Sequence, residues 1–201
     1  APSQHEIDLQ YTDALTMADN VMTTKLLIKE LAQQASVYAT FMPKPISGQN
    51  GSGMHIHQSL FQGDKNTFFD SDDEHQLSIT GKRFIAGLLH HAPEITLITN
   101  QWVNSYKRLV PGFEAPAFIS WAHTSRSDLI RVPAYKPGYE SSMRVEYRAP
   151  DPACNPYLAF SVMLAAGFKG IENEYPVPPA MEGNVFNMSP EERQSKGIKA
   201  M

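Results

Sequence analysis

The stretch NGSGMHIHQSL, residues 50–60, places two histidines one residue apart directly after a glycine-rich turn. On a strand, residues two apart point to the same face, so His55 and His57 would share a face. Imidazole nitrogens placed in this way can bind a divalent metal, or one can bind metal while the other donates to an anion. Two half-exposed histidines on a sheet are the alternative. The preceding glycines favour a function, because they let a backbone approach a ligand closely.

A row of charged residues in SSMRVEYR, residues 141–148, adds a second group of candidates. Strand geometry puts Arg144, Glu146 and Arg148 on one face and the residues between them on the other. A ladder of cross-strand ion pairs would explain this row without any function.

Three further arginines and one acid lie in segments with little apparent structural need for them: Arg108, Arg126, Arg131 and Glu114. Arginine binds carboxylates and phosphates at two points, so a set that converges with Glu146 would suit an anionic substrate and a divalent ion. Glu114 lies in the loop LVPGFEAP, which could carry its carboxylate over such a site, although a solvated loop acid is equally expected. The sequence has no GxxxxGK(S/T), GxGxxG, HExxH or GxSxG motif, so a nucleotide would be held in another way.

The elements that must position these residues follow from the hydrophobic pattern. The predicted helices span residues 16–35, 78–91 with a continuation to 100 past Pro93, and 155–172. The predicted strands span residues 4–11, 54–61, 117–121, 128–132 and 142–148. Residues 105–116 are predicted to be a loop. Because strands and helices do not alternate regularly, the pattern favours an α+β fold with a mostly antiparallel sheet and flanking helices.

Composition limits the classes of partner. With 17 Lys and Arg against 21 Asp and Glu, the net charge of -4 gives no general basic field for nucleic acid or a membrane surface. The single cysteine, Cys154, excludes an internal disulfide and is interpreted as a buried bystander. No apolar run reaches the length of a membrane span and the first residues do not resemble a signal peptide, so a cytoplasmic protein is predicted. Residues 176–201 are polar and turn-rich, and no closing element is expected there.

Several long motifs together resemble one known family. NGSGMHIHQSL, NSYKRLVPGFEAP, RSDLIRVP and RVEYRAPDPACNPYLAF, in this order, are similar to the ATP and glutamate motifs of the glutamine synthetase family, as are FMPKP and QHEID. The similarity covers roughly residues 3–175. It implies that residues 1–175 are part of a catalytic domain with a curved sheet, and that residues 176–201 are a tail that stops before the family's C-terminus.

The resemblance also implies roles for single residues. The implied ligands of Mg²⁺ or Mn²⁺ are Glu6, His55 and Glu146. The implied ATP contacts are His57, Gln58, Ser59, Arg126 and Arg131. The implied glutamate contacts are Asn50, Gly51, Arg108, Glu114 and Arg148, and the implied catalytic residues are Glu114, Arg126 and Arg148. Lys136 and Arg144 are left without an assigned role, because the segment between Arg131 and Glu146 is hard to match.

The implied reaction has two steps: ATP phosphorylates the side-chain carboxylate of glutamate, and ammonia then displaces phosphate to give glutamine. Glutamate, ammonium and ATP are thus the implied small-molecule partners, and a ring-shaped homo-oligomer is the implied assembly. Family members carry further acidic metal ligands and an ammonium pocket outside the segment matched here, so the 201-residue chain by itself is expected to be inactive. The alternatives are a related ligase that uses another amine, a catalytically silent scaffold, and a zinc protein built on the two histidines.

Overall fold

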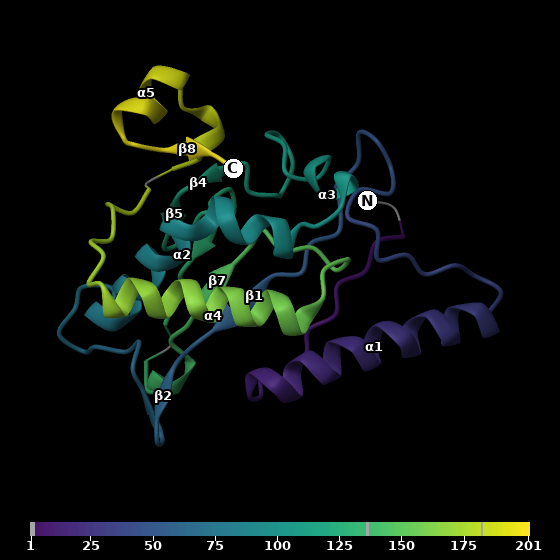
Figure 1. The fold of residues 1–201 in the computed structure, drawn as a ribbon, viewed down its shortest axis with the longest axis horizontal. Coiled ribbons are helices and arrows are strands. Elements are labelled where there is room, and N and C mark those ends of the chain that lie inside the picture. Colours follow the sequence, from purple (N-terminus) through teal and green to yellow (C-terminus); the bar gives the residue numbers. More distant parts are fainter. Residues whose placement is uncertain (1–2, 136, 182) are drawn as a thin grey trace.

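The computed structural model describes residues 3–135, 137–181 and 183–201 (Figure 1). The helices are α1 (Ala14–Gln34), α2 (Ile79–Thr99), α3 (Val103–Tyr106), α4 (Pro156–Glu172) and α5 (Pro190–Ser195), with short 3₁₀ turns at Glu140–Ser142 and Val185–Asn187. The strands are β1 (Ile56–Gln58), β2 (Phe61–Gln62), β3 (Lys65–Asn66), β4 (Phe118–Ile119), β5 (Trp121–Ala122), β6 (Ile130–Arg131), β7 (Val145–Tyr147) and β8 (Lys199–Ala200).

The central sheet has four strands in the order β1-β7-β6-β5. β7 pairs antiparallel with β1 and with β6, whereas β5 and β6 are parallel. The register places Glu146 of β7 opposite His57 on one side and opposite Arg131 on the other. The predicted α+β class with a mostly antiparallel sheet is therefore confirmed, and the register itself brings the charged residues of three strands together.

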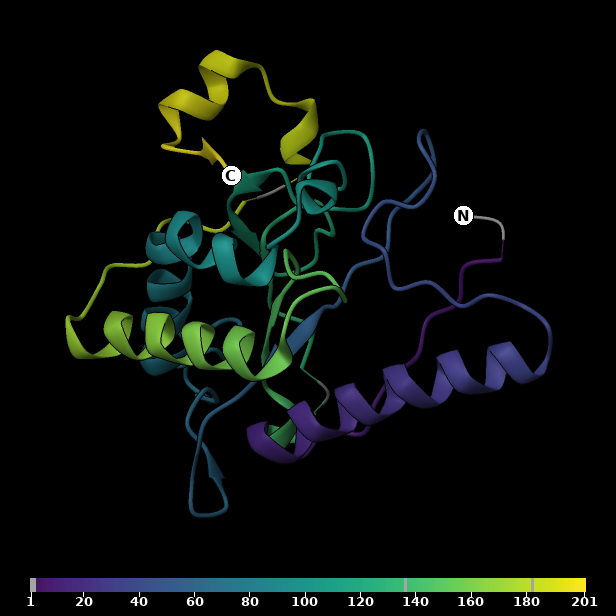
Figure 2. The ribbon, with the colours of Figure 1, turned by 45° about the vertical axis from the view of Figure 1, so that its right-hand side comes forward.

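The hydrophobic core lies between this sheet and the helices α2 and α4, which run side by side in Figures 1 and 2. Val145 and Tyr147 of β7 are fully buried in it, together with Phe84 of α2 and Met163 of α4. Because side chains alternate along a strand, burying these two residues turns Glu146 to the opposite face. The core thus orients the charged row.

The helix ends agree with the local sequence. The side chains of Asp13, Ser78 and Asn155 accept hydrogen bonds from backbone N–H groups of the first turns of α1, α2 and α4. α2 continues through Pro93 to Thr99, as the sequence predicted. Ala92 and Ile95 on either side of the proline are buried in the core, and this packing keeps the helix intact past a residue that cannot donate a backbone hydrogen bond.

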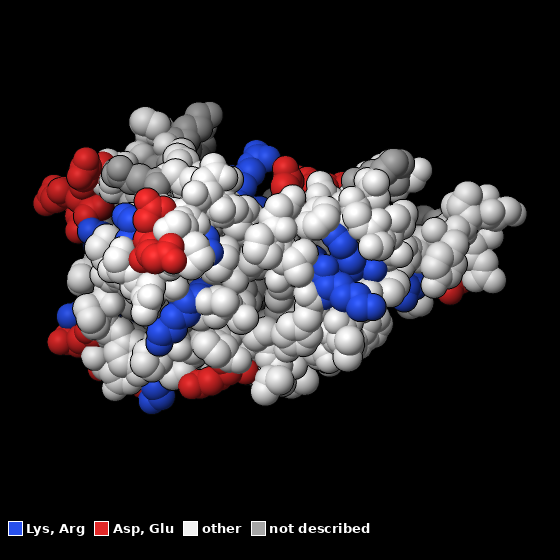
Figure 3. Space-filling model, turned by 90° about the horizontal axis from the view of Figure 1, so that it is seen from above, with Lys and Arg blue, Asp and Glu red and all other residues white. Residues whose placement is uncertain are grey.

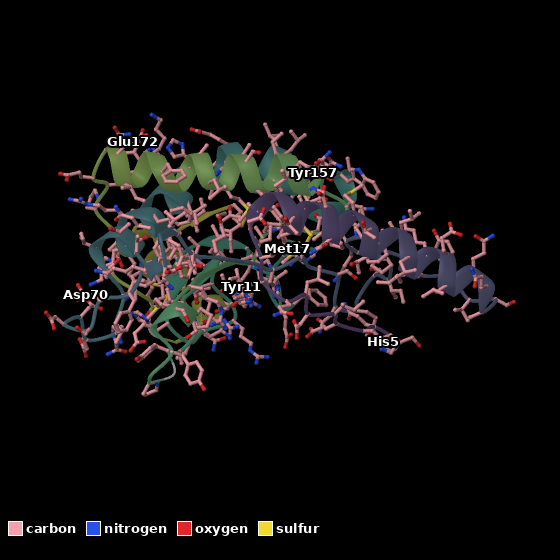
Figure 4. The ribbon with its side chains drawn as sticks, turned by 90° about the horizontal axis from the view of Figure 1, so that it is seen from below. His5, Tyr11, Met17, Asp70, Tyr157 and Glu172 are labelled. Atoms are coloured by element: carbon pink, nitrogen blue, oxygen red, sulfur yellow. The ribbon has the colours of Figure 1, made fainter. Side chains whose placement is uncertain are left out.

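α1 is formed as predicted, but many of its apolar side chains are exposed. Within the helix Ala18 alone is buried, while Leu15, Leu26 and Leu31 are more than half exposed. Figure 4, in which Met17 and Tyr157 are labelled, shows the first part of α1 beside the start of α4 and the rest projecting beyond it. The hydroxyl of Tyr157 donates to Asp19 Oδ1 at 2.5 Å at this contact. None of the described helices is long and apolar enough to cross a membrane.

Four local predictions need correction. Residues 4–11 are extended but form no strand, because no described segment pairs with them; the alternation is real, yet Ile7 and Tyr11 are more than half exposed. The predicted loop 105–116 begins within α3. The hairpin β2-β3, which follows β1, was not predicted as a separate element. The tail carries α5 and β8, and β8 pairs antiparallel with β4, so the expected lack of a closing element is wrong. The predicted strands 54–61, 117–121, 128–132 and 142–148 all contain ladder residues but are shorter than predicted.

α2 and α4 form the most extensive contact between elements, and glycines allow it. A Cβ added to Gly87 would lie 2.2 Å from the carbonyl oxygen of Ala166, and one added to Gly170 would lie 2.1 Å from the carbonyl oxygen of Arg83. These obstacles are backbone atoms, which cannot rotate aside as a side chain can. The two helices therefore pack backbone against backbone at this crossing.

We predict that Gly87→Ala lowers the free energy of unfolding by about 1–3 kcal/mol, because the added methyl group must push the helices apart. Urea unfolding followed by circular dichroism measures the change. Gly81→Ala in the same helix is the matched control, since the three atoms nearest to its Cβ would all be side-chain atoms: Leu77 Cδ1 at 2.7 Å, Leu77 Cγ at 3.4 Å and Phe68 Cβ at 3.5 Å. Equal stability of the two variants would contradict the close packing of α2 on α4.

Candidate active site

Glu146 lies at the centre of the charged face of the sheet, with 1% of its surface exposed. Its carboxylate accepts a hydrogen bond from Arg148 Nη1 at 2.6 Å and another from Arg131 Nε, and His55 Nδ1 lies 3.3 Å from Oε1. Burial alone would raise the pKa of Glu146, but the hydrogen bond from His55 and the charges of Arg148 and Arg131 outweigh it and hold that pKa well below its usual range. The carboxylate is therefore ionised and fully paired.

The two histidines do lie on the same face, and each has a different partner. Partial burial lowers the pKa of both imidazoles below the ordinary value, against the opposing effect of Glu146, and this favours the neutral form of each ring. His55 directs Nδ1 to Glu146, which leaves Nε2 as a free acceptor. His57 Nδ1 accepts a hydrogen bond from Arg144 Nε at 3.1 Å, which leaves its proton on Nε2. One ring thus offers a lone pair and the other a donor.

Arg108 lies beneath the glycine-rich turn and is 2% exposed. Its guanidinium donates to the carbonyl oxygens of Ala149 and Arg148, at 2.7 and 3.1 Å. A Cβ on Gly53 would lie 2.3 Å from Arg108 Nη2, and one on Gly51 would lie 2.3 Å from the carbonyl oxygen of Pro43. These glycines therefore make room for the arginine and for neighbouring backbone. Burial lowers the pKa of Arg108 to about 10, which still leaves it charged at neutral pH.

Other predicted site residues do not join this cluster. Glu6, Asn50 and Glu114 are exposed, and none of them has a side-chain hydrogen bond or ion pair with another described residue. Arg126 is also exposed, but its charge helps to lower the pKa of Arg148, although burial of Arg148 is the larger cause. The N-terminal segment does reach the glycine turn, since Gln4 Nε2 donates to the carbonyl oxygen of Gly51 at 2.8 Å.

Gln58 is the last residue of β1 and Ser59 follows it; both are half-buried. Gln58 points away from the face of His57, and its side-chain Nε2 is buried with no partner among the described residues. A backbone contact to a ligand is therefore the role that the geometry leaves open to Gln58.

The sequence interpretation missed two contributors. Arg144 was left unassigned, yet it orients His57; its place in the Arg-Glu-Arg row was the available signal. Lys44, in FMPKP, is buried beside Arg108, and no spacing rule pointed to it. Lys136, the other unassigned residue, lies outside the described residues. Cys154 is buried as predicted, and burial raises the pKa of its thiol to about 12.

The arrangement suits an anionic ligand. Arg131 and Arg148 pair with the buried carboxylate of Glu146 on one face, and the imidazole of His55 lies beside it. On the face shown in Figure 3, Lys and Arg side chains gather locally and no continuous basic surface is seen. The net charge of -4 and this distribution favour a local anion site over a general basic surface.

Comparison with known proteins gives a consistent result. The family profile described as "Glutamine synthetase, catalytic domain" matches residues 1–201. The chain belongs to the glutamine synthetase family. It is 56% identical over 201 residues to the glutamine synthetase of Mycobacterium tuberculosis H37Rv and 51% identical to that of Methanosarcina mazei. The match takes in 100% of this chain but only 45% and 44% of those relatives, so the chain spans less than half of their length.

A solved structure supports the same family. The chain superposes on Plasmodium falciparum glutamine synthetase, determined by cryo-electron microscopy, with a TM-score of 0.83 and 37% identity. The match covers 87% of this chain and 34% of the Plasmodium chain. The glutamine synthetase fold class expected from the motifs is therefore confirmed.

The divalent metal that the family implies fits these residues only in part. His55 fits well, because a metal-binding imidazole commonly donates its other N–H to a carboxylate, as His55 does to Glu146. Glu146 itself is shared among Arg131, Arg148 and His55, so metal binding by its oxygens would require one of these bonds to be given up. Among the described residues, no group of three or more His, Cys, Asp and Glu side chains is placed to hold an ion, and Glu6 does not join the cluster.

A buried acid behind the site gives a pH-dependent prediction. Asp128 is fully buried, and burial raises its pKa above the usual value of about 4. Hydrogen bonds from neighbouring serine hydroxyls and the charge of Arg148 lower the pKa, but burial has the larger effect. Since the folded state prefers the protonated form, stability is lost as pH rises from the unfolded pKa through the higher folded pKa. We expect Asp128→Asn to raise the melting temperature at about pH 7 and not at about pH 3.5.

Thermal unfolding at these two pH values measures the effect. Asp64→Asn is the control, because Asp64 is exposed in the turn between β2 and β3. An equal change in melting temperature at both pH values would show that ionisation of Asp128 has no part in it.

Proposed function

We propose that this chain is part of a parent protein that ligates ammonia to glutamate at the expense of ATP, through a γ-glutamyl phosphate intermediate. The observation that carries the proposal is the match of the whole chain to glutamine synthetases, at 56% identity to the Mycobacterium tuberculosis protein. The charged cluster around Glu146 supports it, because a pseudoenzyme would be expected to lose such a costly arrangement. A cytoplasmic location, predicted from the sequence, is supported by the single, buried cysteine.

We assign glutamate to the region between the glycine turn and Arg108. In this assignment Asn50 and Gly51 contact the amino acid, while Arg108 and Arg148 neutralise its carboxylates. The support is the burial of both arginines and the close packing of Arg108 against Gly51 and Gly53. Glu114, in the exposed loop that follows, closes over the bound substrate, takes a proton from ammonium and keeps water from the acyl phosphate.

We assign the phosphates of ATP to the opposite end of the same face. His57 donates to them from Nε2, Arg126 and Arg131 neutralise charge on the transferred group, and Gln58 and Ser59 contact the nucleotide nearby. The bond from Arg144 to His57 supports this assignment, since it fixes the tautomer that can donate. Arg148, between the two ends, lies where charge develops on the transferred phosphoryl group.

We assign a divalent ion, Mg²⁺ or Mn²⁺, to His55 Nε2, with Glu6 and Glu146 as the other ligands from this chain. The ion supplies positive charge beside the phosphates of ATP. The parent protein then completes the shell with acids that this chain lacks, and a ring-shaped homo-oligomer is the assembly we propose for it. Light scattering of the purified parent protein tests the assembly.

The reaction is tested by measuring phosphate release and glutamine formation by the parent protein with glutamate, ATP and ammonium. We expect turnover that needs all three substrates, and none from the 201-residue chain, since part of the active site is missing from it. Turnover with a polyamine and not with ammonium would replace the proposal with that of a related γ-glutamyl-amine ligase. Glutamine formation by the 201-residue chain would refute the prediction that it is inactive.

Substitutions of the two histidines are expected to change different kinetic parameters. In the parent protein, His55→Ala should raise the Mg²⁺ or Mn²⁺ concentration needed for half-maximal activity about tenfold or more, because the imidazole that binds the ion is lost. His57→Ala should chiefly raise the KM for ATP. Steady-state kinetics with metal and ATP varied separately distinguishes the two, and identical phenotypes would count against the assignment. His90→Ala, at an exposed position of α2, is the control that leaves both parameters unchanged.

A further inference from the structure

Lys44 is a buried cation with no carboxylate partner among the described residues. It is 8% exposed, and burial together with the nearby charge of Arg108 lowers its pKa. Its ammonium group donates to the carbonyl oxygen of Gln49 and lies 3.5 Å from the centroid of the Phe113 ring. A carbonyl oxygen and the face of an aromatic ring are what offset the loss of water around this charge.

The two partners of Lys44 belong to segments that are far apart in sequence. Gln49 directly precedes Asn50 and Gly51 in the glycine-rich turn, and Phe113 directly precedes Glu114. One ammonium group therefore touches both the turn and the loop to which the proposed glutamate contacts belong. Among the described residues, the Gln49 carbonyl oxygen and the Phe113 ring are the groups in contact with this ammonium, so its charge stabilises the junction between the turn and the loop.

The backbone of Lys44 is fixed from behind. Its N–H donates to Asn104 Oδ1 at 2.7 Å, and Asn104 Nδ2 donates back to its carbonyl oxygen at 3.0 Å. The preceding residue, Pro43, accepts a hydrogen bond from the N–H of Ser52 at 2.8 Å. Because α3 and the glycine turn hold the backbone of Lys44, its ammonium group has a defined position from which to contact Phe113.

We propose that Lys44 is a positioning residue of the glutamate site, whose ammonium group holds the Phe113–Glu114 loop against the Gln49–Gly51 turn. This inference rests on the proposed function and deepens it, since it concerns how that site closes. Phe113 is half-buried while Glu114 is exposed, so Phe113 is the point at which the loop is attached to the body. A shift of Phe113 by about 1 Å would move Glu114 away from the bound substrate, and a misplacement of this size is enough to lower activity strongly.

The first test uses the parent protein. Lys44→Met keeps a long unbranched side chain but removes the charge, and Lys44→Arg retains a cation that can lie over an aromatic ring. We expect Lys44→Met to raise the KM for glutamate about tenfold with the KM for ATP changed less than about twofold, and Lys44→Arg to restore most of the loss. Lys29→Met is the matched control: its ammonium lies 5.8 Å from the Phe41 ring, away from the site, and it should leave both KM values unchanged.

A double-mutant cycle identifies the interaction. Phe113→Leu should reproduce the effect of Lys44→Met, Phe113→Tyr should not, and the double variant Lys44→Met, Phe113→Leu should be no worse than either single change. Additive effects would overturn the proposal. So would an equal rise in both KM values with a lower melting temperature, because that is the result of a purely structural role.

Hydrogen exchange of the substrate-free parent protein tests the same inference without catalysis. Lys44→Met should speed the exchange of amides in residues 107–115 and leave those of α2 unchanged. Unchanged exchange in residues 107–115 would overturn the proposal even if the protein makes glutamine. Conversely, failure of the unmodified protein to make glutamine overturns the proposed function alone. If Lys44→Met does not fold, the same measurements are made on Phe113→Leu and Phe113→Tyr. The proposal then requires that Phe113→Leu shows the loss and Phe113→Tyr does not.

Discussion

The ionised carboxylate of Glu146, buried in the middle of a sheet, is the constraint on which the rest of the site depends. A buried charge is tolerated only when it is paired, and removing one partner of such a pair costs about 3–5 kcal/mol. Arg131 and Arg148 supply the opposite charge and His55 supplies a further hydrogen bond. These three side chains must therefore stay in place for the chain to fold with this carboxylate inside, and so the site is organised before any ligand binds.

The central strand connects this cluster to the hydrophobic core. Val145 and Tyr147 are held between the sheet and the helices α2 and α4, and their burial turns Glu146 to the other face. A shift of register by one residue would exchange the two faces and place a carboxylate among apolar side chains. The same three residues of β7, Val145, Glu146 and Tyr147, therefore specify both the core packing and the geometry of the site.

Close approach of backbone atoms recurs in two places with different consequences. At Gly87 and Gly170 it lets two helices pack tightly beneath the sheet, and at Gly51 and Gly53 it lets Arg108 and the Pro43 backbone lie against the turn. The first contact supports the core and the second shapes the candidate glutamate site. Both follow from the missing Cβ.

The sequence by itself determined the family, the α+β class, the positions of the three long helices and the shared faces of the charged residues, because periodicity and motifs are local properties. It could not determine that residues 4–11 lack a strand partner, that many apolar side chains of α1 are exposed, or that Lys44 reaches Phe113. Only the tertiary structure decided which residues pair with Glu146 and which remain apart from it, as Glu6 does. The physical reason is that pairing and burial depend on segments distant in sequence, whose approach no local pattern encodes.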